Sequence, residues 1–300
     1  MSELPTVYLI DASIYVFRAW FSLPASLTGH QGQPVNAAYG FSRFLAEFCD
    51  RSQARHVGIA FDESLTSSFR NDLYKPYKMN RELPPSELKQ QFSLCRKIAT
   101  AAGFHCVSHD RYEADDLIAT MAHNLRAEGF RIAIVSGDKD LTQIIRARDF
   151  WWDFARNQRL DAAGVADKFG VPPAAIPDFL GLCGDAVDNI PGVPGVGPKT
   201  AVTLLQRYGS IESVYAHLDD LRVLPLRGAK GLKAKLRPHQ EQALLSKKLA
   251  TVCYTAPISP HIDALARHHV EWSALQDISR TMGGRGDGLF TRLAQTAPDQ

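Results

Sequence analysis

The sequence predicts an α/β fold, in which a mainly parallel central sheet flanked by helices is followed by a mostly helical C-terminal part. Over the first 155 residues, short apolar runs alternate with helical stretches, which is the pattern of strands joined by crossover helices. After about residue 160, helical segments punctuated by Pro and Gly replace the strand-like runs. Acidic residues follow several predicted strands, and ligands of parallel sheets gather beyond the carboxyl ends of their strands.

The first part, residues 1–160, is expected to form the α/β core. Its clear strands are predicted at residues 6–11, 56–62 and 131–137, with a shorter candidate at 104–107, and its helices at 37–51, 86–101 and 113–128. Pro84 and Pro85 suit the start of the second helix, where the missing amide hydrogen costs no hydrogen bond. Leu117, Met121 and Leu125 recur every four residues and give the third helix one apolar face.

The second part, residues 161–295, is expected to be helical. Helices are predicted at 160–171 and 175–184, followed by a helix–hairpin–helix at 188–208. Between residues 222 and 248 the chain is strongly basic, although the net charge of the whole chain is only +2. A nucleic-acid partner must therefore be recognised by local basic patches and not by a bulk positive charge.

The composition favours a globular protein of a reducing compartment. The five cysteines form no CxxC pair, so neither a disulfide framework nor a zinc site is indicated. The N-terminus enters a strand without a signal-peptide pattern, and no apolar run approaches 18 residues. We therefore expect a cytoplasmic protein without membrane association, and a monomer.

Nine carboxylates form the strongest functional pattern. Two unit charges about 4 Å apart repel by about 4 kcal/mol at an effective dielectric of 20, so clustered carboxylates need a cation. Hard oxygen ligands suit Mg²⁺ or Mn²⁺, and nine of them suggest two metal ions, the arrangement that hydrolyses phosphodiesters. Helix capping is the alternative for single members, and Asp116 is also a candidate for a supporting role behind the metal. The set is Asp11, Asp62, Glu113, Asp115, Asp116, Asp138, Asp140, Asp185 and Asp188.

The glycine-rich stretch GVPGVGPKTA is the second pattern. Glycines at a tight turn before a helix let backbone amides approach a phosphate, and the helix N-terminus adds a partial positive charge. A plain corner between two helices is the alternative, but the neighbouring cations favour binding of the DNA backbone. The residues expected to contact DNA here are Gly192, Gly195, Gly197, Lys199 and Thr200.

Basic and aromatic residues interleave in FRNDLYKPYKMNRELPP, directly after the strand that ends at Asp62. Such a segment can bind phosphates and stack on unpaired bases, although many charged runs are only solvated surface. Its position predicts a basic cap over the carboxylates, within residues 70–100. Arg70, Lys75 and Tyr77 are expected to bind DNA.

Together these motifs resemble the 5′-nuclease superfamily, which includes flap endonucleases and the 5′→3′ exonuclease domain of bacterial DNA polymerase I. LIDAS, FDES, YEADD, SGDKDL and GDAVDNIPGVPGVGPKTA carry the resemblance, which spans residues 5–295 and favours a free-standing bacterial-type member. It implies a PIN-like core and DNA as partner. It also implies a first metal at residues like Asp11, Asp62, Glu113 and Asp115, and a second at residues like Asp138, Asp140, Asp185 and Asp188.

The resemblance further implies catalytic roles for three basic residues and a monovalent cation, K⁺, at the helix–hairpin–helix. Lys78 would lie near the scissile phosphate, Arg81 would contact the cut strand, and Arg18 occupies a position where the family also places a basic residue. The expected activity is structure-specific 5′→3′ exonuclease and flap endonuclease cleavage, and a polymerase partner stays open. The alternatives are a non-catalytic DNA-junction binding module and a small-molecule phosphatase.

Overall fold

The computed structural model describes residues 5–63, 67–225, 228–258 and 260–297. Its central sheet has six strands in the order β3-β2-β1-β4-β5-β6, of which only β6 runs antiparallel to its neighbour. The predicted mainly parallel sheet is thus confirmed. The strands are β1 (Thr6–Asp11), β2 (His56–Asp62), β3 (His105–His109), β4 (Arg131–Val135), β5 (Phe150–Asp153) and β6 (Gln158–Leu160).

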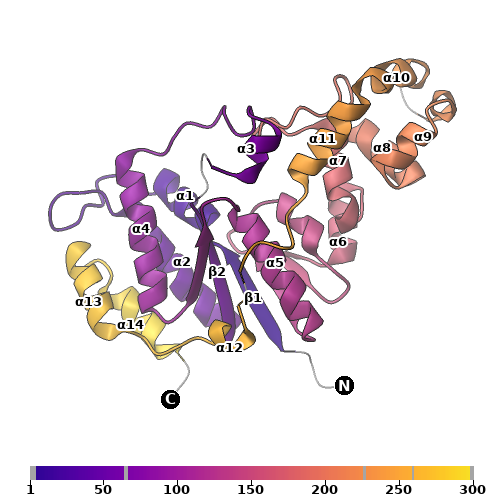
Figure 1. The fold of residues 1–300 in the computed structure, drawn as a ribbon. Coiled ribbons are helices and arrows are strands. Elements are labelled where there is room, and N and C mark those ends of the chain that lie inside the picture. The colour runs from indigo at the N-terminus through magenta and orange to yellow at the C-terminus, as the bar shows by residue number, and fades with distance from the viewer. Residues whose placement is uncertain (1–4, 64–66, 226–227, 259, 298–300) are drawn as a thin grey trace.

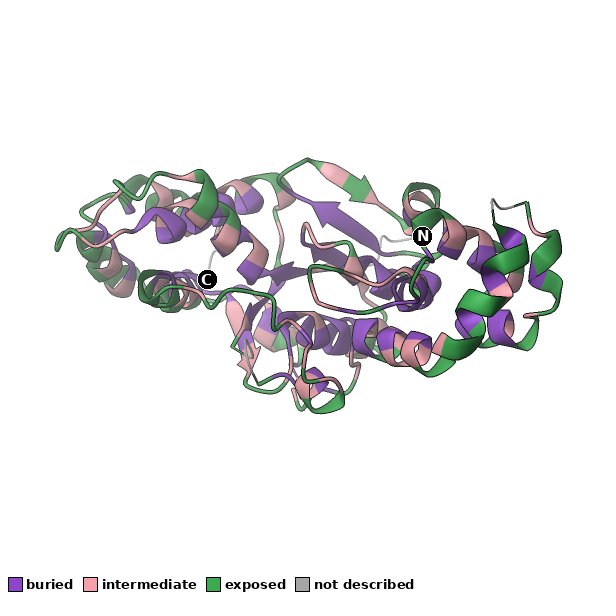
Figure 2. Cartoon of the chain, turned by 90° about the horizontal axis from the view of Figure 1, so that it is seen from above, coloured by how far each residue is buried: buried purple, intermediate pink, exposed green. Residues whose placement is uncertain are grey.

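Helices cover both faces of the sheet (Figure 1). One face packs on helices α1 and α2, with α4 beyond them, and the other packs on α5. Most residues of β1, β2, β4 and β5 are buried (Figure 2), because strands of a parallel sheet lie between two layers of helices. These helices are α1 (Ala12–Ser22), α2 (Asn36–Ser52), α3 (Phe69–Leu73), α4 (Ser86–Ala101) and α5 (Ala114–Ala127).

A second hydrophobic cluster holds the helical part together. It is built from helices α7 to α11 and lies beyond the carboxyl ends of the strands, on the same side as α3 (Figure 1). Within the range 188–208 predicted to hold a helix–hairpin–helix, only α8 is helical, and the helix before the glycine-rich turn is α7, which ends at Cys183. The helices of this part are α6 (Ala162–Phe169), α7 (Ile176–Cys183), α8 (Pro198–Tyr208), α9 (Ile211–Ala216), α10 (Ala229–Leu236) and α11 (Gln240–Ala250).

After α11 the chain returns to the α/β core. Val252 and Leu265 pack with α5, whereas Leu275 and Phe290 join the cluster on the opposite face, beside α2 and α4. The prediction of one helical part over 161–295 did not include this return, and the division at residue 160 stays a prediction. The returning helices are α12 (Ile262–Leu265), α13 (Trp272–Thr281) and α14 (Asp287–Gln295). Among the described residues, no helix combines the length and apolar character needed to cross a membrane.

Candidate active site

The ends of three adjacent strands place three aspartates close together. Asp11 ends β1 and caps α1 by accepting a hydrogen bond from the Ser13 amide at 3.1 Å, and its second oxygen accepts from the Ser136 hydroxyl at 2.9 Å. Asp62 ends β2 and accepts from the Ala114 amide at 2.7 Å, at the start of α5. Asp138 follows β4. Because the strands are parallel neighbours, their carboxyl ends meet at one edge of the sheet.

Helix α5 begins at this edge and brings Glu113, Asp115 and Asp116 to it. Glu113 is the N-cap, and Asp116 completes a capping box by accepting from the Glu113 amide at 3.1 Å. Burial raises the pKa of Asp115 well above its ordinary range, and the neighbouring charges of Asp138, Asp11 and Asp62 raise it further. Asp115 and Asp116 are adjacent in the first turn of α5, so their side chains leave the helix in different directions and have different surroundings.

The structure corrects the metal assignment of Asp116. Its side chain has no exposed surface, and Arg70 binds both carboxylate oxygens, at 2.7 and 2.8 Å. The amides of Glu113 and Cys253 donate to the same two oxygens, at 3.1 and 2.7 Å. A carboxylate offers about four lone-pair sites, and all four are used here, so Asp116 has none left for a metal.

Arg70 and Tyr77 are buried and are not the DNA contacts that the sequence predicted. Arg70 is 2% exposed and also donates to the backbone carbonyls of Leu249 and Thr251, at 2.8 and 2.9 Å. Tyr77 is 3% exposed, and its hydroxyl lies 3.1 Å from Glu113 Oε2 and 3.3 Å from Asp188 Oδ2. Neither side chain presents a face on which a base could stack.

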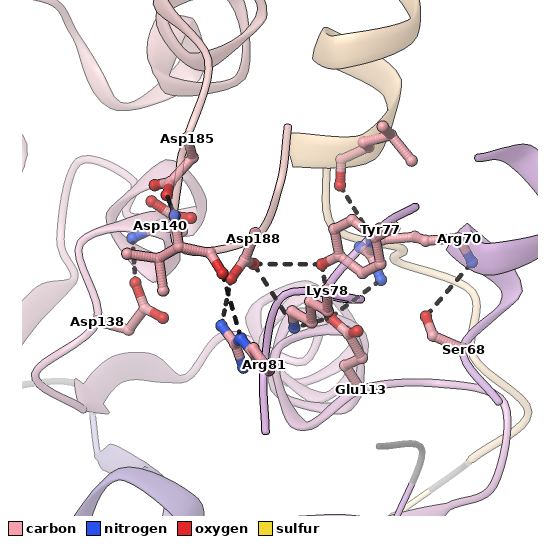
Figure 3. Close-up of polar contacts among 12 residues, drawn as sticks. Ser68, Arg70, Tyr77, Lys78, Arg81, Glu113, Asp138, Asp140, Asp185 and Asp188 are labelled. Atoms are coloured by element: carbon pink, nitrogen blue, oxygen red, sulfur yellow. Dashed lines mark hydrogen bonds and ion pairs between the residues drawn. The ribbon is translucent and has the colours of Figure 1, made fainter. Parts of the chain in front are cut away.

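Lys78 and Arg81 lie among the carboxylates, as Figure 3 shows. The Lys78 ammonium is 2.9 Å from Glu113 Oε2 and 3.6 Å from Asp188 Oδ2, and Arg81 forms an ion pair with Asp188. Burial alone would raise the pKa of Glu113, but Lys78 and Arg70 lower it to about 2. The pKa of Lys78 is itself raised well above its ordinary range, because Glu113 outweighs the burial that opposes its charge.

A second group of carboxylates surrounds Lys139. Its ammonium lies 2.6 Å from Asp185 Oδ2 and 3.2 Å from Asp140 Oδ1. Asp140 Oδ1 is buried and accepts no hydrogen bond from the described residues. Burial and the charge of Asp138 raise the pKa of Asp140 to about 7, whereas Lys139 outweighs burial at Asp185 and lowers its pKa. Lys139 was not among the predicted site residues, since a single Lys between two Asp carries no distinguishing pattern.

Part of the negative charge of the carboxylates is not compensated by the basic side chains among them. Burial, Asp62 and Asp138 raise the pKa of Asp11 to about 7, so neighbouring negative charges are incompletely compensated. Within the described residues, no three His, Cys, Asp or Glu side chains yet converge on a common point. Lys78, Arg81 and Lys139 instead neutralise several of the acids. The carboxylates supply hard oxygen ligands of the kind that divalent cations prefer.

Among the described ion pairs, none joins Arg18 or Lys75 to these carboxylates. Arg18 is exposed on α1 and lines a cavity of about 240 Å³ together with Arg43, Glu47 and Arg51, none of which belongs to the carboxylate set. Lys75 is exposed on the segment before Lys78. Eight of the nine acids thus remain candidate metal ligands, and two of the three predicted catalytic cations lie among them.

The glycine-rich turn presents two of its three predicted glycines to solvent. Gly195 (φ 77°) and Gly197 are exposed, and so is Lys199 in the first turn of α8, with Thr200 half-buried. Gly192 is instead buried, with its amide donating to Ser246 and its carbonyl accepting from Gln242. A Cβ at Gly192 would lie 2.2 Å from the Gly184 amide nitrogen, so packing within the hairpin requires this glycine.

Family models and solved structures agree with this fold. Residues 6–170 match the N-terminal resolvase-like domain of the 5′-3′ exonucleases, and residues 171–273 match their C-terminal SAM fold. Solved structures with the same fold include T5 5′-exonuclease with bound zinc, at a TM-score of 0.64 and 18% identity over 98% of this chain and 100% of that one. The catalytic core of Rad2 with DNA superposes at 0.61, with 15% identity over 97% and 92%.

Curated relatives are of two kinds. The DNA polymerase I of Bacillus caldotenax is 40% identical over 263 residues, which are 86% of this chain and 29% of the polymerase. The chain thus spans less than a third of that polymerase. The 5′-3′ exonuclease of Buchnera aphidicola subsp. Acyrthosiphon pisum is 34% identical, over 84% of this chain and 88% of its own length. Both domain models and these relatives place the chain in the 5′-3′ exonuclease family.

Proposed function

We propose that this chain is a divalent-metal-dependent 5′ nuclease that hydrolyses DNA phosphodiesters near 5′ ends and at junctions of single strand and duplex. The observation that carries the proposal is the gathering of eight carboxylates from five separate chain segments at one edge of the sheet, with Lys78 and Arg81 among them. Family membership and the DNA complex of the structural neighbour Rad2 support DNA as the substrate.

The proposed ligand set has two groups. Asp11, Asp62, Glu113 and Asp115 surround the first position, and Asp138, Asp140, Asp185 and Asp188 surround the second. Two divalent ions, Mg²⁺ or Mn²⁺, would activate a water and stabilise the leaving oxygen when bound. Lys78 neutralises charge that grows on the phosphate, and Arg81 holds the strand being cut. Asp116 and Arg70 support this site from behind.

The exposed part of the glycine-rich turn would bind the duplex backbone. Gly195 and Gly197 offer backbone amides, and Lys199 stands beside them at the N-terminus of α8. Contacts to phosphates carry no sequence information, which suits an enzyme that recognises a junction. We include K⁺ at the hairpin in the proposal, on the basis of the family resemblance.

Asp62→Ala tests the proposed function. A panel of 5′-labelled flap, nicked and single-stranded DNA with Mg²⁺ should be cut by the wild-type protein, with preference for substrates that contain duplex. The variant should lose cleavage and keep DNA binding, because the phosphate contacts lie elsewhere. Asp167→Ala, which removes an exposed acid on α6, serves as the matched control. A folded Asp62→Ala variant that cuts at the wild-type rate would contradict the metal assignment, and a wild-type protein that binds without cutting would indicate a junction-binding module.

A further inference from the structure

The segment that carries Lys78 is bound to the loop that carries Asp185 and Asp188 by hydrogen bonds to backbone carbonyls. The Lys78 amide donates to the Asp188 carbonyl at 3.0 Å. The Asn189 side-chain amide donates to the Pro76 carbonyl at 2.6 Å, and that of Asn80 donates to the Ala186 carbonyl at 2.8 Å. Two segments more than 100 residues apart in the sequence are thereby fixed to each other.

Both segments contain a residue in the left-handed region. Lys78 has φ 56° and Asn189 has φ 55°, and only two further non-glycine residues of the described chain have positive φ. Asn adopts this conformation more readily than other non-glycine residues, whereas a Lys there is strained. A strained backbone persists only where surrounding contacts hold it in place. Around Lys78 these are the Asp188 carbonyl on its amide and the side-chain amides of Asn189 and Asn71 on the carbonyls of Pro76 and Tyr77, the two residues before it.

We infer that Asn189 is a positioning residue for Lys78. Its side chain holds the Pro76 carbonyl, two residues before Lys78, while the carbonyl of the preceding residue, Asp188, holds the Lys78 amide. These two contacts direct the ammonium toward Glu113 and Asp188, at 2.9 and 3.6 Å. Asn189 itself touches no reacting atom. The inference rests on the proposed function, since its effect is measured as DNA cleavage.

The simpler alternative is that Asn189 only closes a turn. Residues 185 and 190 are joined by a bridge with hydrogen bonds of 2.9 and 2.8 Å, and a left-handed residue suits such a turn. Asn189→Gly separates the two roles, because Gly keeps the left-handed backbone and removes only the side-chain amide. Asn157→Gly is the matched control, since Asn157 is also left-handed (φ 51°) but lies in the β5–β6 turn.

The experiment measures single-turnover cleavage of a 5′ flap at saturating enzyme, DNA affinity without divalent metal, and the melting temperature. Asn189→Gly should lower the cleavage rate on the order of tenfold to a hundredfold, as expected for a misplacement of about 1 Å, with unchanged DNA affinity. Asn157→Gly should leave the rate unchanged. In a Lys78→Ala background, Asn189→Gly should cause no further loss, because the residue through which it acts is gone.

Two results would overturn the inference: a wild-type rate for Asn189→Gly, or an equal loss in the presence and absence of Lys78. If Asn189→Gly does not fold, Asn189→Asp takes its place in the same cycle, because Asp tolerates the turn but cannot donate to the Pro76 carbonyl. Wild-type protein that fails to cut any substrate contradicts the proposed function and is thus distinguishable from failure of the positioning role.

Discussion

At the scale of single residues, burial separates the charged side chains proposed to take part in the chemistry from those that support the site. Arg70 and Asp116 are fully paired and almost without solvent contact, and together they join α3, the start of α5 and the segment 249–253. Lys78 and Arg81 pair with the candidate ligands and retain exposed surface, so a phosphate can reach them. The same stretch of sequence thus supplies both a structural ion pair and the proposed catalytic cations.

Breaking the Arg70–Asp116 pair should destabilise the protein strongly. Arg70→Met leaves the buried Asp116 charge without its main partner, which typically costs about 3–5 kcal/mol. The double variant Arg70→Met/Asp116→Leu should recover part of this free energy of unfolding, because no unpaired charge remains. Urea unfolding measures both, with the exposed Lys75→Ala as control within about 0.5 kcal/mol of wild type. A double variant less stable than Arg70→Met alone would contradict the argument.

Lys78→Ala should lower the single-turnover cleavage rate more than DNA affinity. Its ammonium lies among the candidate metal ligands, so its loss affects charge that develops on the phosphate. Removal of one such electrostatic group typically costs about 10²–10³ in rate. Lys75→Ala is the matched comparison, because Lys75 is exposed three residues earlier. If both variants show small effects of equal size that disappear at low salt, Lys78 only steers DNA.

At the scale of elements, the N-terminus of α8 and helix α10 form one basic surface. Lys235 of α10 lies against the glycine-rich turn, and its Nζ would be 3.2 Å from a Cβ at Gly195. Lys199 is exposed in the first turn of α8, directly after the same turn. A DNA phosphate at the turn would therefore meet backbone amides and two ammonium groups.

Lys199→Ala should weaken binding to duplex-containing DNA more than binding to single strands. Loss of one phosphate contact should reduce the slope of log affinity against log salt concentration by about one unit. Fluorescence anisotropy over a salt series measures this slope, with Lys97→Ala, an exposed residue near the end of α4, as control. Unchanged affinity together with an unchanged slope would leave the hairpin with a purely structural role.

The sequence predicted elements best where a local pattern determines them. Helix α4 begins and ends as predicted, at residues 86 and 101, and the strands ending at Asp11 and Asp62 have their predicted bounds. Helix α1 was not predicted, because ASIYVFRAWFS is rich in aromatic and β-branched residues and shows little polar alternation. Strands β5 and β6 were not predicted either, because four and three residues are too few to show an alternation of apolar and polar residues.

The same reasoning explains the candidate site. Carboxylates that follow strands could be predicted, because topology alone brings strand ends together. The roles of Arg70, Tyr77 and Gly192 could not, because each depends on partners far away in sequence. Arg70 binds carbonyls 179 and 181 residues away, and Gly192 binds side chains 50 and 54 residues away. Residue type predicts a charge or a turn but not the segment that buries it.

At the scale of the whole molecule, the segment after α11 joins the helical part to the core. Gln143 donates to the Ala250 carbonyl and accepts from the Val252 amide, while the Thr120 hydroxyl accepts from the Ala256 amide. These contacts lie beside Asp116 and Asp140, so they attach the helical part to the core next to the candidate metal ligands. The stability of the whole fold should therefore respond to the charge state of the carboxylate cluster.

Mg²⁺ should raise the melting temperature more at pH 8 than at pH 5.5. Without metal, burial and neighbouring charges raise the pKa of both Asp11 and Asp140 to about 7, above the value near 3.9 of an unfolded chain. The folded state then binds more protons than the unfolded state between these values, so the free energy of unfolding falls as pH rises through this range. A bound cation offsets the repulsion that remains at high pH, and a ligand at a hundredfold its dissociation constant adds about 2.7 kcal/mol.

Thermal melts at both pH values, in chelator and in excess Mg²⁺, measure the effect. Asp11→Asn is the decisive comparison, because it removes one of the titrating carboxyl groups and one proposed ligand. Histidines also titrate in this pH range, and the variant keeps all of them, so their contribution to the pH dependence stays the same. Its chelated protein should lose less stability between pH 5.5 and 8, and its response to Mg²⁺ should be smaller than that of the wild-type protein. If Mg²⁺ raised the melting temperature of both proteins equally at both pH values, the carboxylate cluster would not be the site that binds the cation. That result would contradict the proposal of a metal-dependent nuclease.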